Sequence, residues 1–332
     1  MKIIAVLVSI LLVARFTSAQ EPASPASDAI FKVNVKMVMV DTQVVSKKTH
    51  RAMNFLQQDD FRLYEDGIPQ EISSFSQDAL PLSVVLLFDL TASVHPVLKS
   101  LANGALQALH RLKPEDEVAV IVYSASATTV QDFTTDREVA AAAIAKASRM
   151  ESDEAAFFNE GIFQAVSQLE KSGNPIGRKV IVWMTDNIPN LPTDEISGRY
   201  GRSLHGKRPH GEREALAALF RTGTVVCTLL QVDDSWINSS RGAISDRMLY
   251  PPGDVYRYAE QTGGWVMEST RKAVNSKLAD LIDEIRVRYS LGYHPSVERP
   301  AGRFCRINVK LSPAVIKQEG KVFVEARRGY YR

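Results

Sequence analysis

Apolar and polar residues alternate strictly in the first part of the chain after residue 30. The apolar positions are Phe31, Val33, Val35 and Met37, and the polar ones are Lys32, Asn34 and Lys36. A period of two predicts a strand with one buried face. Residues 60–75 carry strand patterns on both sides of Asp66-Gly67, a pair typical of a hairpin turn. Residues 30–80 are therefore predicted to form a small antiparallel β unit.

The pattern changes at Leu82. Continuous apolar runs occupy 83–89, 117–123, 179–186 and 224–232, and such runs are typical of strands covered on both faces. Apolar residues at helical spacing fill 94–112, 138–148, 162–169, 255–263 and 271–287. WVME (265–268) is expected to be an edge strand. This alternation predicts an α/β domain over 81–287, built on a doubly wound, mostly parallel sheet with helices on both faces.

After Arg288 the pattern is again that of strands. RYSLGYHP, RFCRINVKLS and KVFVEARRGYY predict three strands within 288–332. The two β-rich segments fit either one β-sandwich, into which the α/β domain is inserted, or two separate flanks. The sequence leaves both arrangements open.

The N-terminus has the organisation of a signal peptide. Lys2 precedes an apolar run over 3–13, and Thr17-Ser18-Ala19 forms a cleavage signal. The run is shorter than the roughly 20 residues of a membrane span. Cleavage would leave a Pro/Ser/Ala-rich lead-in at 20–29 and no stable membrane span. We expect a secreted protein, periplasmic or extracellular; the alternative is an uncleaved N-terminal anchor.

Charge and cysteine content narrow the function classes. Removal of residues 1–19 takes away Lys2 and Arg15 and no acid, which leaves 38 basic and 38 acidic residues. A balanced charge gives no reason to expect a nucleic-acid partner. Cys227 and Cys305 fall in different predicted parts, the parallel sheet and the C-terminal strands. We therefore expect no disulfide between them.

Oxygen-bearing side chains follow two of the predicted buried strands. Asp89 ends the first strand and is followed by Thr91 and Ser93, while Asp186 ends a later strand. Ligands of doubly wound sheets bind at the carboxyl ends of the strands. An oxygen-only set at that place suits a hard cation such as Mg²⁺. The structural alternative is that these residues cap the next helix, with Ser93 as its N-cap.

These residues resemble a known family. FDLTAS is similar to the Asp-x-Ser/Thr-x-Ser signature of the von Willebrand factor type A family, and MTDN to its later strand-end Asp-Gly, with Asn187 in place of glycine. The flanks resemble those of secreted bacterial proteins related to this family. The stretches concerned are FRLYEDGIPQEISSF, AEQTGG, RYSLGYHP and RRGYYR.

The resemblance implies a metal-ion-dependent adhesion site. It places Thr91 and Ser93 on the ion directly and Asp89 and Asp186 there directly or through water, with an acidic group of a protein partner completing the coordination. It implies a binding module without catalysis or an organic cofactor.

The middle loop departs from the family pattern. The family's threonine falls on Ala155 or Ala156 within ESDEAAFFNEGIF (151–163), so we expect a degenerate site. The nearby residues that offer an oxygen instead are Ser152, Asp153, Glu154 and Asn159.

A long insertion, 187–213, follows Asp186 and is expected to rim this site. It is basic and suits contact with an acidic partner, or it is a solvated loop. The expected rim residues are Asn187, Arg199, Arg202, Lys207 and Arg208.

Enzymatic alternatives lack essential residues. A phosphatase of the Asp-x-Asp type needs an acid where Thr91 stands, and a serine hydrolase of the Gly-x-Ser-x-Gly type has no such motif here. We therefore do not expect an enzyme. A metal-independent interaction module and a structural envelope protein remain as alternatives, with a cryptic hydrolase last.

Overall fold

The computed structural model describes residues 37–332 except for 50, 92–93, 153–155, 188–209 and 233–253. The predicted signal peptide, the lead-in and most of the first alternating segment lie outside these residues. Within the described part, no helix is both long and apolar enough to cross a membrane.

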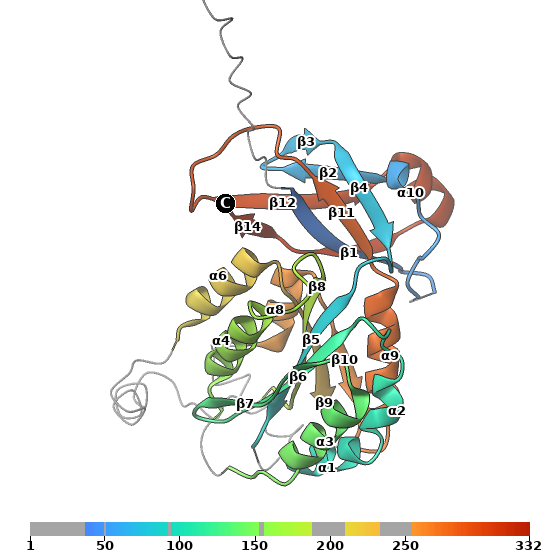
Figure 1. Ribbon diagram of the computed structural model, residues 1–332. Coiled ribbons are helices and arrows are strands. Elements are labelled where there is room, and N and C mark those ends of the chain that lie inside the picture. Colours follow the sequence, from blue (N-terminus) through green and yellow to red (C-terminus); the bar gives the residue numbers. More distant parts are fainter. Residues whose placement is uncertain (1–36, 50, 92–93, 153–155, 188–209, 233–253) are drawn as a thin grey trace, which may run out of the picture. The chain divides into compact units, whose positions relative to one another are not determined.

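A six-stranded sheet forms the centre of the α/β part (Figure 1). In spatial order it comprises β10 (Val266–Ser269), β9 (Val225–Gln231), β8 (Arg178–Thr185), β5 (Leu82–Asp89), β6 (Glu117–Tyr123) and β7 (Ala127–Thr134). All neighbours run parallel except β6 and β7, which are antiparallel. This confirms the predicted fold class. Strand β7 was not predicted, because its mostly half-exposed residues lack a buried-strand pattern.

Helices cover both faces of this sheet and separate its apolar residues into two clusters. One cluster includes residues of α1 (His95–Ala102), α2 (Ala105–Leu109), α3 (Arg137–Ala147) and α9 (Val274–Arg286). The other includes residues of α4 (Phe158–Leu169), α6 (Glu212–Thr222) and α8 (Val255–Thr262). Along β5, Leu86 belongs to the first cluster and Leu87 to the second. A strand buried on both faces explains the continuous apolar run.

The helical pattern at 94–112 forms two helices instead of one. It breaks at Asn103-Gly104, between α1 and α2. A Cβ at Gly104 would lie 2.6 Å from the Asn275 side chain of α9. The spacing of apolar residues does not predict this close approach. The approach requires a small residue at one position, and it leaves the helical period unchanged.

Strands from both ends of the chain pair with each other above the α/β part (Figure 1). One sheet is β13 (Val322–Ala326), β1 (Val38–Ser46), β11 (Tyr289–Tyr293) and β4 (Ile72–Gln77). The other is β14 (Gly329–Tyr331), β12 (Phe304–Leu311), β2 (Phe61–Glu65) and β3 (Ile68–Gln70). The short helices η1 (Gln58–Asp60) and α10 (Pro313–Glu319) accompany them. One hydrophobic cluster holds residues from both sheets, such as Val40 and Ile307.

The expected hairpin at Asp66-Gly67 joins β2 and β3. Both residues have positive φ, 49° and 84°, as the favoured two-residue hairpin turn requires. The two cysteines are buried free thiols in different cores, Cys227 on β9 and Cys305 on β12. This agrees with the expectation of no disulfide between them.

Candidate functional site

Asp89 is the last residue of the central strand β5 and is fully buried. Its Oδ1 accepts a hydrogen bond from the Thr91 N–H at 2.9 Å. Its Oδ2 accepts from the Tyr123 hydroxyl at 3.0 Å and from the Thr185 hydroxyl at 2.9 Å. The neighbouring strands β6 and β8 supply these two hydroxyls, so the parallel register fixes the carboxylate on both sides.

Sequence reasoning missed Tyr123 and Thr185 as parts of this site. Tyr123 is directly opposite Asp89 in the β5–β6 register, and its hydroxyl also accepts the indole N–H of Trp183 at 2.9 Å. Thr185 immediately precedes Asp186 in the sequence. Their positions in the sequence could have indicated them, because both are polar residues at the ends of predicted buried strands.

Asp186 follows β8 at the same end of the sheet and is also buried. The structure therefore brings the two predicted acids to the same end of two adjacent strands. Burial, and secondly repulsion from Asp186, raise the pKa of Asp89 from 3.8 to about 6, against the opposing effect of the hydrogen bonds from Thr91 and Thr185. Two buried like charges make this end of the sheet attractive to a cation.

Of the two hydroxyl residues in the predicted motif, the structure describes one, Thr91. Thr91 is buried, and its carbonyl accepts the N–H groups of Val94 and His95 at 3.0 and 3.2 Å. Ser93 lies outside the described residues. The N-cap of α1 is Val94, without a side-chain capping bond. The alternative in which Ser93 is the N-cap concerns a residue outside the described part and stays a prediction.

Asn187, which replaces the family's glycine, adopts a left-handed backbone with φ of 58°, a region that glycine favours and asparagine tolerates. Its N–H donates to Thr185 Oγ1 at 3.1 Å. Its side-chain oxygen accepts the Val255 N–H, at the start of α8, at 3.2 Å. Asn187 therefore holds the end of β8 to α8 at the edge of the site.

The middle loop is described on either side of residues 153–155. Ala156 is buried in the apolar cluster of α4 and does not supply an oxygen. Ala155, Asp153 and Glu154 lie outside the described residues, whereas Ser152 is described and half-buried.

Asn159, another suggested substitute, is engaged elsewhere. Its amide donates to the His210 carbonyl at 2.9 Å, and its oxygen accepts the Tyr258 hydroxyl at 2.5 Å. It therefore connects α4 to residues near α6 and α8.

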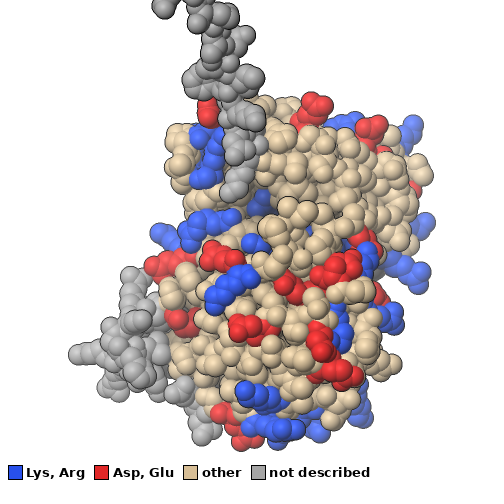
Figure 2. Space-filling model, viewed as in Figure 1, with Lys and Arg blue, Asp and Glu red and all other residues tan. Residues whose placement is uncertain are grey.

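The basic rim residues Arg199, Arg202, Lys207 and Arg208 lie outside the described residues. His210, just after them, stacks on Phe163 with ring centroids 3.7 Å apart, and its Nδ1 lies 2.9 Å from Glu160 Oε1. These contacts attach the end of the insertion to α4. On the face shown in Figure 2, basic and acidic side chains of the described residues are interspersed.

The described donors are chemically suited to a hard cation. Asp89, Thr91 and Asp186 offer only oxygens, and Mg²⁺ prefers oxygen ligands while keeping several waters. A site of three or more His, Cys, Asp or Glu side chains is not present among the described residues. The donor set therefore suits an ion held by two acids, hydroxyl groups and water, and not the nitrogen and sulfur ligands of a typical zinc site.

In doubly wound α/β domains, ligands bind at the carboxyl ends of the strands, which is where Asp89 and Asp186 lie. Residues 84–188 match the family described as von Willebrand factor type A domain. The chain carries a domain of this family, and domains of this family generally mediate protein–protein interactions. A search of curated proteins finds no match to the chain.

Solved structures of low identity are similar to the chain. BatB, a conserved hypothetical protein of Bacteroides thetaiotaomicron, is 14% identical, with 61% of this chain and 98% of that chain covered and a TM-score of 0.42. The vWF domain of the type V pili tip protein Mfa5 of Porphyromonas gingivalis is 11% identical, with 63% and 96% covered and a TM-score of 0.43. A von Willebrand factor type A protein of Catenulispora acidiphila is 11% identical, with 83% and 74% covered and a TM-score of 0.45.

Proposed function

We propose that this chain binds a protein partner at the carboxyl end of its von Willebrand factor type A sheet, with a divalent cation held at a partly degenerate site. The observation that carries the proposal is the pair of buried acids, Asp89 and Asp186, at the end of adjacent central strands. Two carboxylates placed together in a buried place repel each other. A ligand of opposite charge would offset this repulsion, which supports the proposal.

The residues proposed to hold Mg²⁺ are Asp89, Thr91, Ser93 and Asp186. When bound, the ion supplies a positive charge that accepts an acidic group of the partner. Tyr123 and Thr185 orient the Asp89 carboxylate through their hydroxyl groups. The missing threonine at Ala155 or Ala156 weakens the site, and we expect a millimolar requirement for Mg²⁺.

The rim of this site is proposed to contact the partner through Asn187 and the basic insertion. Its basic residues, Arg199, Arg202, Lys207 and Arg208, suit an acidic partner surface. We also propose that the protein is exported, with its mature N-terminus at Gln20. Intact-mass measurement of the extracytoplasmic protein tests this, and retention of residues 1–19 in a membrane fraction would contradict it.

The ion is tested by thermal unfolding in EDTA, then with Mg²⁺ or Mn²⁺. At a concentration a hundredfold above the dissociation constant, binding stabilises the native state by about 2.7 kcal/mol. We expect a higher melting temperature with either ion for wild type and for the control Asp280→Asn, which removes an exposed acid from α9. We expect no ion response for Asp89→Asn, which keeps the side-chain shape.

Restoration of the family's threonine makes the test sharper. Ala155→Thr is expected to enlarge the ion response. Ala156→Thr tests the other position that the family's threonine can take, but Ala156 is packed in the apolar cluster, so the added atoms are expected to destabilise the protein. A response only after Ala155→Thr would favour a metal-independent interaction module. The absence of a response in every variant would refute the metal site.

A further inference from the structure

A surface rich in basic residues lies where the loop after β1 meets α10 and the start of β13 (Figure 1). Two segments that are far apart in the sequence form it. Its five basic residues are all exposed, and we call them the basic surface: Lys47, Lys48, Arg51, Lys317 and Lys321. Among the described residues, none of the five forms an ion pair.

Backbone contacts hold the two segments of the basic surface together. The Lys47 N–H donates to the Lys321 carbonyl at 3.0 Å, and the Ser46 N–H donates to the Arg51 carbonyl at 3.0 Å. Lys317 lies in the last turn of α10, just before Lys321. The positive charges are therefore gathered by the fold and do not merely follow one another along the chain.

Two large apolar side chains are exposed among these charges. Phe323 lies on β13 opposite Val45 of β1 and is 45% exposed, and Lys47 Nζ lies 4.0 Å from the centre of its ring. Ile316 precedes Lys317 on α10 and is 42% exposed. A partner that covers the basic surface would remove both side chains from water, which is favourable.

The charge of these segments differs from that of the whole chain. Residues 46–56 and 312–323 contain the five basic residues and one acid, Glu319, whereas the chain without residues 1–19 has equal numbers of bases and acids. The next acids after the two segments are Asp59, Asp60 and Glu325. The positive charge is therefore a local feature, and it is balanced by acids elsewhere in the chain.

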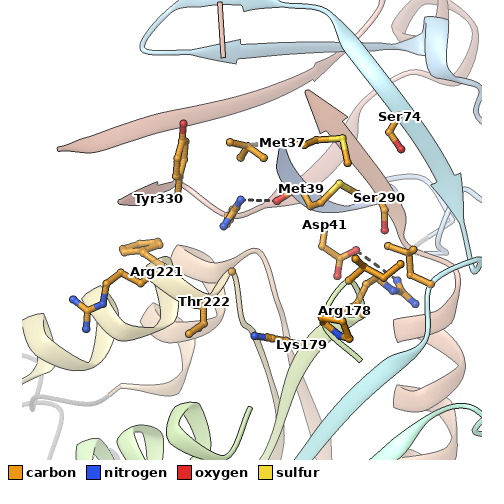
Figure 3. Close-up of a pocket in the computed structure, with 18 of the residues that line it drawn as sticks. Met37, Met39, Asp41, Ser74, Arg178, Lys179, Arg221, Thr222, Ser290 and Tyr330 are labelled. Carbon is orange, nitrogen blue, oxygen red and sulfur yellow. Dashed lines mark hydrogen bonds and ion pairs between the residues drawn. The ribbon is translucent and has the colours of Figure 1, made fainter. Parts of the chain in front are cut away.

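The basic surface is separate from the cavity between the β13-β1-β11-β4 sheet and the α/β part (Figure 3). That cavity has a volume of about 780 Å³, and Met39, Asp41 and Arg178 are among the residues that line it. The five basic residues do not line it, and neither do Phe323 and Ile316. A small ligand in the cavity would not reach them, whereas an extended partner surface would.

We propose that the basic surface binds an anionic lipid bilayer. The lysines and Arg51 attract the anionic headgroups, and Phe323 and Ile316 enter the boundary between headgroups and acyl chains. A soluble polyanion would satisfy the charges and leave the two apolar side chains in water. The combination of unpaired bases with exposed apolar side chains therefore favours a bilayer.

A bilayer at this place leaves the acidic site free. Arg178, the first residue of β8, pairs with Asp41 of β1, and Asp186 follows the last residue of β8. At about 3.3 Å per residue, β8 keeps Asp186 about 25 Å from this contact with β1. Membrane binding through the basic surface therefore does not depend on the cation or the protein partner proposed for the carboxyl end of the sheet.

Co-sedimentation of the purified protein with lipid vesicles tests the proposal. One set of vesicles contains phosphatidylcholine alone, and the other also contains phosphatidylglycerol, which is anionic. We expect binding to the anionic vesicles, weakened by added salt, and little binding to the neutral ones. Equal binding to both sets, or no binding to the anionic vesicles, would overturn the proposal.

Charge variants locate the binding. One basic side chain near an anionic bilayer contributes about fivefold to affinity, so the double variant Lys48→Gln/Lys321→Gln should bind anionic vesicles about 25-fold more weakly. The matched control is Lys146→Gln/Lys171→Gln, which removes two exposed bases from other parts of the chain. We expect the control to bind as wild type does. Equal weakening in the two double variants would show attraction by overall charge and would refute the site.

Fluorescence quenching separates a bilayer from other anionic partners. Phe323→Trp places an indole in the basic surface, and Tyr256→Trp places one on α8, where Tyr256 is 50% exposed. With brominated lipids in the anionic vesicles, we expect stronger quenching than in wild type for Phe323→Trp and no such gain for Tyr256→Trp. Binding without this gain at position 323 would refute insertion into a bilayer and would favour an acidic protein or a soluble polyanion.

Discussion

Replacement of Asp41 by asparagine tests the buried charge cluster between the β13-β1-β11-β4 sheet and the α/β part. Asp41 lies on β1, and it pairs with Arg178 at the start of β8 and with Arg288 just before β11. The side chains of Arg178 and Arg288 are 5% and 0% exposed, and that of Asp41 is 12% exposed. Asp41→Asn keeps the shape and removes the carboxylate that pairs with both arginines among the described residues.

The expected loss of stability follows from this burial. Removal of one partner from a buried ion pair costs about 3–5 kcal/mol. Asparagine can still accept a hydrogen bond, so we expect a loss near the lower end, about 3 kcal/mol. Asp280→Asn is the matched control, since Asp280 is 56% exposed and lies 3.5 Å from Lys277. An exposed pair of this kind contributes at most about 1 kcal/mol.

Urea unfolding at pH 7, followed by tryptophan fluorescence, measures both effects. The midpoint urea concentration of Asp41→Asn should fall. The slope of the unfolding free energy against urea concentration should stay constant, since the surface exposed on unfolding does not change. A loss no larger than that of Asp280→Asn would refute the reasoning, because it would mean that the two arginines do not depend on Asp41.

Three further predictions concern the core and the acidic site. Burial and Asp186 raise the pKa of Asp89 from 3.8 to about 6, so in EDTA wild type should lose up to about 3 kcal/mol of stability as pH rises from about 4 to 6. Asp89→Asn should lack this pH dependence in urea titrations. Gly264→Ala should prevent or severely weaken folding, measured by circular dichroism, because its Cβ would lie 1.9 Å from the Val226 carbonyl oxygen. Thiol titration without reductant should find Cys227 and Cys305 unreactive in the native protein and both reactive after denaturation.

The sequence predicted the position of the acidic site because its geometry follows from a simple rule. Asp89 and Asp186 each end a continuous apolar run, and such runs become neighbouring parallel strands, β5 and β8. Parallel strands place their carboxyl ends at one edge. Pattern and polarity therefore placed both acids at the carboxyl edge, and the structure shows that their strands are neighbours.

The sequence did not reveal the residues that hold Asp89 in place. Tyr123 donates to it across a sequence separation of 34 residues and Thr185 across 96. Both hydroxyls lie at strand ends, where apolar periodicity carries no information about partners. The Asp41–Arg288 pair, separated by 247 residues, was unpredictable for a related reason. It depends on how strands from the two ends of the chain pair, an arrangement that the sequence left open.

The two ends of the central sheet carry opposite excesses of buried charge. Asp89 and Asp186 lie at the carboxyl end, and Arg178, with Arg288 and Arg327 near it, at the amino end. Neither group is needed to form the sheet, since the apolar clusters on its two faces supply the burial that drives folding. Arg178 and Arg288 are paired with Asp41, and Asp89 accepts hydrogen bonds from Thr91, Tyr123 and Thr185. What these contacts leave in place is the repulsion between the two buried acids, and a bound cation would relieve that repulsion.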